Sequence, residues 1–85
     1  MNDITVDHLL AAIHDALTLP LPTTIKARPA YLELARDRAA AVRRAVDHAR
    51  KSGDLARATD MVDEAIGTLP VTYPSLGPAG VEVRR

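Results

Sequence analysis

The sequence predicts an all-α domain, a three-helix bundle in which an N-terminal helix covers a helical hairpin, followed by an extended C-terminal tail. Two observations lead to this fold class. Apolar residues recur at steps of three and four in three segments, and this spacing places them on one face of an α-helix. Helix-capping residues, prolines and glycines stand at the ends of these segments. We therefore expect helices near 4–18, 29–52 and 55–68 in a domain of residues 1–70, with a tail at 71–85.

The first helix can be capped by Asp3 or Thr5, and it ends before Pro20 because proline disfavours helical geometry in the preceding residue. Its apolar stripe consists of Val6, Leu9, Leu10, Ile13 and Leu17. The connector LPLPTTIKAR follows, and we expect three of its apolar residues to pack against the helices, namely Leu19, Leu21 and Ile25.

The second helix is the longest helical run, and Pro29 suits its first turn while Gly53 can adopt the left-handed conformation that ends it. Its apolar seam consists of Leu32, Ala35, Ala39, Val42, Val46 and Ala49. Most of these residues are alanines, which allow a neighbouring backbone to approach closely but supply little apolar area. The helix therefore needs close contact along much of its length.

Asp54 can cap the third helix directly after Gly53, and so short a turn makes the second and third helices antiparallel neighbours. The third stripe consists of Leu55, Ala58, Val62, Ala65, Ile66 and Leu69. The tail, VTYPSLGPAGVEVRR, contains too much proline and glycine for a helix, although Val81 and Val83 alternate as in a short strand. We expect its first part to be anchored on the bundle by Val71, Tyr73 and Leu76.

A second apolar line on the second helix makes its apolar arc wider than the bundle is expected to bury. This line consists of Tyr31, Leu34, Ala41 and Ala45. We therefore expect self-association as a twofold dimer through this helix, because a second copy adds to the core of a marginal chain. The expected interaction surface consists of Tyr31, Leu34, Ala41, Ala45, Arg43, Arg44 and Tyr73. The alternative is that the first helix and the connector cover both lines within one chain.

Nothing in the sequence forms a recognisable catalytic, cofactor or metal site. The chain contains no cysteine, and His8 and His14 are six residues apart, about 120° around a helix, whereas helical metal ligands are three or four apart. We expect a protein that is not an enzyme and uses no cofactor. The alternative is a small hydrolase or metal-dependent protein that uses these histidines and Asp15.

Eleven basic and eleven acidic residues give zero net charge, so no long-range field attracts nucleic acid or an anionic membrane. We expect a cytoplasmic protein-interaction module that binds a second copy or another protein. The alternative is a DNA-associated accessory or regulatory protein, because the second helix carries Arg36, Arg43, Arg44 and Arg50. Against it, acidic residues interrupt this strip and the third helix presents Asp60, Asp63 and Glu64, which repel phosphates.

Two stretches resemble known proteins. ARKSGDLARATDMVDEAIGTLP, residues 49–70, resembles the second half of a tetratricopeptide repeat, in which two alanines allow close helix packing and a proline ends the unit. No second copy of the repeat is present, so a single helical hairpin is expected. The pattern L-L-A-A-I-H-D-A-L-x-L-P-x-P from Leu9 to Pro22, with the later P-V-T-Y-P, resembles short uncharacterised proteins of actinobacteria and their phages. This resemblance implies provenance and carries no active-site motif.

Overall fold

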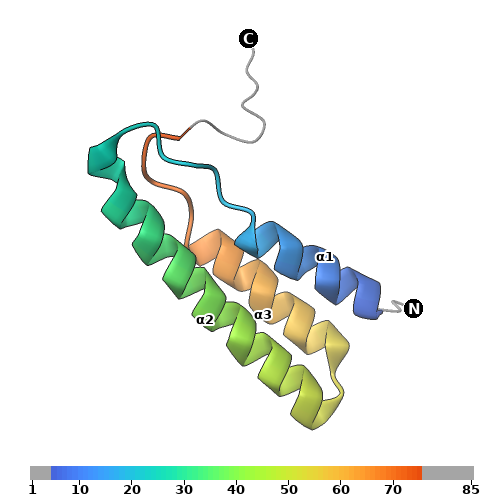
Figure 1. Cartoon of the computed structure of the whole chain (residues 1–85). Helices are drawn as coiled ribbons and strands as arrows, with labels where there is room; N and C mark the ends of the chain where they lie inside the picture. Colours follow the sequence, from blue (N-terminus) through green and yellow to red (C-terminus); the bar gives the residue numbers. More distant parts are fainter. Residues whose placement is uncertain (1–4, 76–85) are drawn as a thin grey trace.

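Residues 5–75 of the computed structural model form three α-helices and a structured connector (Figure 1). The helices are α1 (Val6–Leu17), α2 (Arg28–Ser52) and α3 (Leu55–Thr68), and a 3-10 turn, η1 (Ile25–Ala27), leads into α2. The expected all-α, three-helix fold is confirmed, and the helix ends lie within two residues of their expected positions. Leu76, Val81 and Val83 lie outside the described residues, so the expectations for them keep that status.

Side chains and one glycine set the helix ends. The Thr5 hydroxyl accepts the His8 backbone N–H at 3.4 Å, and His8 Nδ1 accepts the Thr5 backbone N–H at 3.1 Å. This reciprocal pair satisfies two donors that have no partner inside the helix. Gly53 ends α2 with a φ of 75°, and Asp54 then begins α3 by accepting the Arg57 N–H at 2.9 Å.

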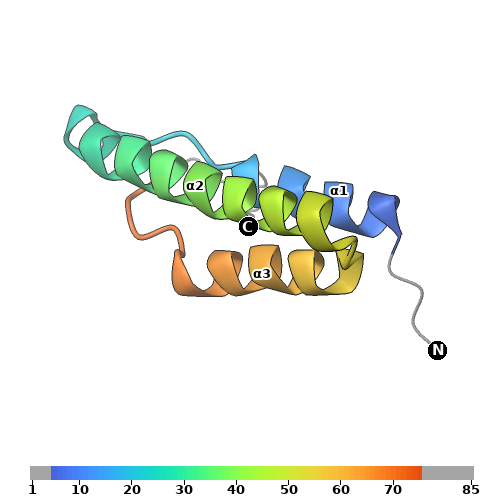
Figure 2. The same cartoon turned by 90° about the horizontal axis from the view of Figure 1, so that it is seen from below.

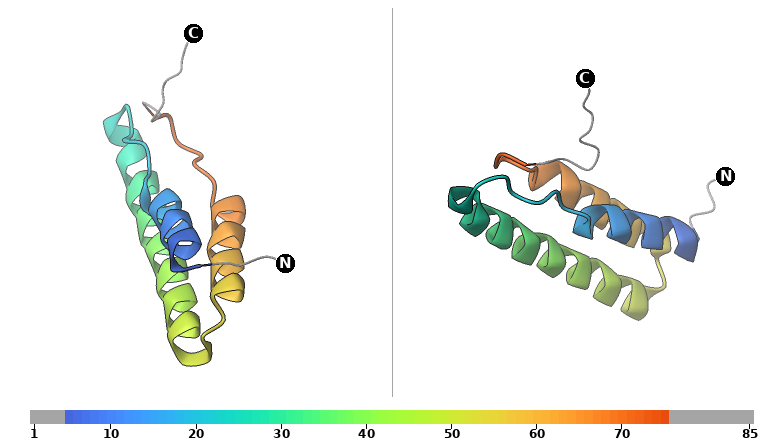
Figure 3. Two further views of the ribbon diagram at one scale, coloured as in Figure 1. Left: turned by 90° about the vertical axis from the view of Figure 1, so that its right-hand side faces the viewer. Right: turned by 45° about the horizontal axis from the view of Figure 1, so that its top comes forward.

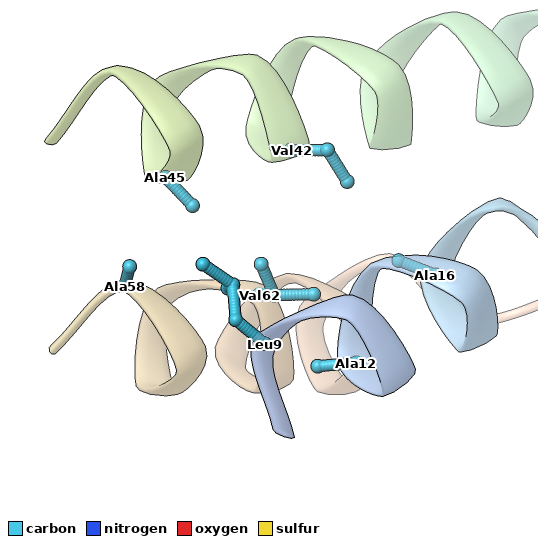
Figure 4. Close-up of a cluster of buried hydrophobic side chains, with 7 residues drawn as sticks. All are labelled: Leu9, Ala12, Ala16, Val42, Ala45, Ala58 and Val62. Atoms are coloured by element: carbon cyan, nitrogen blue, oxygen red, sulfur yellow. The ribbon is translucent and has the colours of Figure 1, made fainter. Parts of the chain in front are cut away.

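The helices lie in two layers, with α1 and α2 in one layer and α3 in the other (Figures 2 and 3). α2 runs antiparallel to both of its neighbours (Figure 1). Seven buried residues form the main core between the layers, namely Leu9, Ala12, Ala16, Val42, Ala45, Ala58 and Val62 (Figure 4). Because four of the seven are alanines, the three backbones approach closely and the core contains few large side chains.

A second, smaller cluster forms where the segment after α3 packs against the connector between α1 and α2. Tyr73 is buried with Ala27 and Leu34, its ring meets that of Tyr31 edge to face at a centroid distance of 5.9 Å, and its hydroxyl donates to the Pro20 carbonyl at 2.7 Å. The Thr23 N–H donates to the Pro74 carbonyl at 3.1 Å. The expected anchoring role of Tyr73 is confirmed. That of Val71 is not, because its side chain is exposed.

Arg38 is buried in the middle of α2, with 5 % of its surface exposed. Its Nη1 donates to the Ala16 carbonyl at 3.1 Å, and its Nε and Nη2 donate to the Leu69 carbonyl at 3.0 and 2.8 Å. These carbonyls end α1 and α3, where the helix dipoles are negative. Arg38 therefore ties the C-terminal ends of both neighbours to α2.

The apolar stripe expected on α3 is confirmed, because all six of its residues are buried or pack partly buried against the two clusters. The stripes expected on α1 and α2 are only partly correct, because each of these helices leaves one edge of its stripe exposed. On α1 the buried residues are Leu9, Ala12 and Ala16, whereas Val6, Leu10 and Leu17 are exposed. On α2 the expectation for Leu32 is wrong, since it is exposed and the buried line passes through Leu34 and Arg38. The physical reason is that the buried edges also carry small residues, Ala12 and Ala16 on α1 and Ala41 and Ala45 on α2, which allow close helix contact.

Two further expectations need correction. Leu21 and Ile25 of the connector are exposed, and only Leu19 packs against the small cluster. The line expected to face a second copy is covered within one chain, because Leu34, Ala41 and Ala45 are all buried there. The reason given for a dimer through that line is therefore lost.

Candidate interaction surface

The exposed apolar side chains of α1 share one flank of the helix. Val6 and Leu10 are each 55 % exposed and Leu17 is 49 % exposed. At about 100° per residue, these three lie within about 40° of one another and about 100° from the buried line. The helix therefore carries two apolar faces, and the core uses only one of them.

α2 carries a similar flank. Leu32 is 55 % exposed and Ala39 is exposed. Both lie about 130° from the buried line of α2, in the same rotational sense as the exposed flank of α1. The opposite flank, with Ala41 and Arg44, lines a groove with α3. The flank with Leu32 therefore points away from α3.

The two flanks lie on the same side of the molecule. For two neighbouring antiparallel right-handed helices, flanks displaced in the same rotational sense from their buried lines face the same side. That side is the outer side of the α1–α2 layer, with α3 behind it (Figures 1 and 2). We call this surface the outer face and define it by Val6, Leu10, Leu17, Leu32 and Ala39.

Charged residues border the outer face. Arg36, Arg43 and Arg50 are exposed along one line of α2, because steps of seven return to nearly the same angle on a helix. We call this line the basic border. The ion pairs within residues 5–75 are His14 with Asp15 and Lys51 with Asp47. No arginine of the basic border is in an ion pair there, although Asp47 lies between Arg43 and Arg50 on the same side of α2. On α1, the residues beside the apolar flank are Asp7 and His14, which are also seven residues apart.

Two of the hollows beside the helices contain residues that were expected to have a role. One, of about 400 Å³, lies at the connector and is lined mainly by apolar or neutral groups, including Leu21, Ile25 and Tyr31. The other, of about 600 Å³, lies between α2 and α3, where Arg44 and Arg57 stand beside Glu64 and Met61. Both hollows are open to solvent.

The structure separates the residues that were expected to form one interaction surface. Arg43 lies on the basic border and Arg44 in the groove between α2 and α3. Tyr31 is half-buried at the connector, Tyr73 is buried beside it, and Leu34, Ala41 and Ala45 belong to the interior. Sequence reasoning placed Val6, Leu10, Leu17 and Leu32 in the core. The signal that could have shown their exposure is the width of the stripe on α1, which exceeds what one helix contact covers.

The titratable side chains do not converge on one another. His8 serves the N-terminal cap of α1, and His14 Nδ1 lies 3.9 Å from Asp15 at an exposed position. Across residues 5–75, no group of three or more histidine, aspartate or glutamate side chains is placed to hold a metal ion. Each helix in the described part of the chain is too short or too polar to cross a membrane.

A comparison with models of protein families found no match, and comparisons with curated proteins and with solved structures found none either.

Proposed function

We propose that this chain is a non-catalytic protein-interaction module whose contact surface is the outer face. The observation that carries the proposal is the apolar flank of α1, where three large side chains are about half exposed on one line. Single exposed apolar residues are common on soluble proteins, but a contiguous set bordered by charge is typical of a binding surface. These residues are not part of the core, and contact with a partner would account for their apolar side chains.

The test is position-dependent photocrosslinking of the full chain in the cells that express it. A benzophenone amino acid replaces Leu10 on the outer face in one variant, and Asp63 on the exposed side of α3 in the control. We expect defined protein adducts from position 10 that disappear when Leu17→Glu is added, and none from position 63. Equal adduct patterns from both positions, or no adducts from either, contradict the proposal.

A second candidate function is association with DNA, which the basic border favours. Three arginines along one helix line can follow a phosphate backbone, although Asp47 lies between two of them and three acidic residues of α3 are exposed elsewhere on the same small domain, namely Asp60, Asp63 and Glu64. Fluorescence anisotropy with duplex DNA distinguishes the two functions. Sub-micromolar binding that weakens steeply with salt, and weakens further in an Arg36→Ala, Arg43→Ala and Arg50→Ala variant, favours DNA association; its absence favours the protein-interaction module.

A further inference from the structure

We infer that the groove between α2 and α3 binds α3 of a second copy of this chain, in a twofold dimer with the two α3 helices antiparallel. α1 packs along one side of the hairpin that α2 and α3 form. The hollow of about 600 Å³ is the groove on the other side of this hairpin, and it contains no residue of the outer face. The inference therefore goes beyond the proposed function and does not depend on it.

The floor of this groove allows close contact with a helix. Ala41 of α2 and Ala65 of α3 line the hollow and are only 6 % and 8 % exposed. Small residues let a neighbouring backbone approach, as Ala12 and Ala16 of α1 do in the main core. Met61 lies beside this floor, and its flexible thioether side chain adapts to an irregular contact.

The flank of α3 that lines the groove carries charge in a self-complementary order. Arg57, Met61 and Glu64 lie within about 60° of one another around α3, because they are separated by four and three residues. Along the helix they present a positive, an apolar and a negative group. Neither charged residue is in an ion pair within residues 5–75. A helix that presents the same order in the opposite direction complements this flank, and α3 of a second copy is such a helix.

The sequence positions fix the register of the two copies. The midpoint between Arg57 and Glu64 lies half a residue from Met61, about 0.8 Å along the helix axis. A twofold axis across α3 at this point places Arg57 of each copy opposite Glu64 of the other, and the two Met61 side chains meet at the centre. A parallel pair would place like charges opposite each other, which is unfavourable, so charge selects the antiparallel pair.

Arg44 of α2 adds a second arginine beside each glutamate. Counting along α2 and α3 in opposite directions from the turn between them places Arg44 level with residue 63, beside Glu64. Each Glu64 carboxylate then lies between Arg44 of its own chain and Arg57 of the second copy. Two carboxylate oxygens accept hydrogen bonds from both guanidinium groups.

The other acidic residues of α3 do not face the second copy. Asp60 lies about 100° from Met61 around the helix, on the side away from Ala65 and the groove floor. Asp63 lies about 160° from Met61, and both aspartates are exposed. The antiparallel contact therefore brings no pair of acidic side chains face to face.

The short length of α3 limits the affinity. α3 has 14 residues and is about 21 Å long. At a helix diameter of about 10 Å, two such helices cover a footprint of roughly 400 Å² when each lies in the groove of the other copy. Stable interfaces bury about 800 Å² per partner. We therefore expect a weak dimer with a dissociation constant in the micromolar range.

Sedimentation equilibrium of the full chain, from micromolar to submillimolar concentration, tests the dimer. We expect the mass to double with concentration and Glu64→Arg to raise the dissociation constant at least about fivefold, because it affects two symmetric charge contacts. Asp63→Arg is the matched control, since it makes the same charge change at the next residue and should leave the dimer intact. Both side chains are exposed, so helical circular dichroism should be unchanged. A monomer throughout, or equal effects of the two changes, overturns the inference.

A charge exchange tests the pairing. Arg57→Glu alone should weaken the dimer, whereas Arg57→Glu combined with Glu64→Arg places opposite charges together again across the interface. The double variant should therefore recover most of the loss caused by Glu64→Arg. Losses that simply add overturn the pairing.

A disulfide tests the position of the axis. The chain contains no cysteine, so Met61→Cys and Asp63→Cys each introduce a single thiol. Under mild oxidation Met61→Cys should form a covalent dimer, because residue 61 meets its own copy at the axis, and Asp63→Cys should not. Equal crosslinking at both positions, or crosslinking at position 63 alone, overturns the arrangement and leaves the proposed function of the outer face standing.

Discussion

At the scale of the residue, Arg38 links the three helices by hydrogen bonds that its position in the sequence does not predict. A charged residue in a helical stripe is usually exposed, yet here the guanidinium is buried and bonded to the final carbonyls of two neighbouring helices. Within residues 5–75 it forms no ion pair. Its charge is stabilised by helix dipoles and hydrogen bonds, and its five donors in a planar fork suit that geometry.

Replacing Arg38 should therefore cost far more stability than replacing an exposed arginine. We expect Arg38→Met to lower the free energy of unfolding by about 2 to 4 kcal/mol, because the Ala16 and Leu69 carbonyls lose their partner. Arg36→Met is the matched control on the same helix and should change it by less than about 0.5 kcal/mol. Urea denaturation measures both values, and equal effects would show that Arg38 is not the link between the helices.

Tyr73 should make stability depend on alkaline pH. Burial raises the pKa of the Tyr73 hydroxyl, the nearby Tyr31 adds to the rise, and Arg38 lowers it. The net shift is upward, so the neutral phenol is favoured in the folded state, and its contribution is complete below the unfolded pKa of about 10 and lost as pH rises through the folded value. We expect Tyr73→Phe to weaken the decline in melting temperature above pH 10.

Tyr31→Phe is the control for this pH dependence, because it keeps the ring contact and leaves the Tyr73 hydroxyl bonded to Pro20. It should retain most of the alkaline decline. If Tyr73→Phe and the original chain lose stability in parallel from pH 9 to 11, the buried hydroxyl is not the group that titrates.

At the scale of the element, helix ends were predictable and the burial of helix edges was not. Gly53, Asp54 and Pro20 are local signals: Gly53 ends α2, Asp54 caps α3, and α1 ends three residues before Pro20. The choice between Leu9 and Leu10 as a core residue is not local, because both belong to one wide apolar arc. It depends on which edge lets α1 approach α2 and α3, and only the assembled bundle decides that. The candidate interaction surface was missed for the same reason.

Substitutions at two glycines test two different effects, the need for a left-handed backbone in a turn and the low helix propensity of glycine. Gly53 has a φ of 75°, whereas Gly67 lies in α3, and an added Cβ would meet no heavy atom within 4 Å at either site. Gly53→Ala should therefore cost about 1 kcal/mol through backbone strain alone. Gly67→Ala should raise stability by about 0.5 to 1 kcal/mol through helix propensity. Thermal denaturation measures both, and changes of the same sign would contradict the assigned turn.

At the scale of the whole molecule, the protein combines a small, alanine-rich interior with a second apolar surface. Of the seven fully buried residues of the main core, three are larger than alanine, namely Leu9, Val42 and Val62, and the other large side chains packed against them are only partly buried. The stability of the isolated chain is therefore expected to be modest. A partner bound to the outer face would add apolar burial where the fold leaves it out. Binding of such a partner is therefore expected to raise the melting temperature.

The central claim is that α1 has two apolar faces, one used by the core and one left for a partner. Adjacent leucines allow one matched measurement, the free energy of unfolding of Leu9→Ala and Leu10→Ala in urea, at a concentration low enough to keep the chain monomeric. Leu9 is 7 % exposed and Leu10 is 55 % exposed. We expect a loss of about 2 to 4 kcal/mol for Leu9→Ala and less than about 1 kcal/mol for Leu10→Ala. Equal losses, or a larger loss at Leu10, would contradict the account.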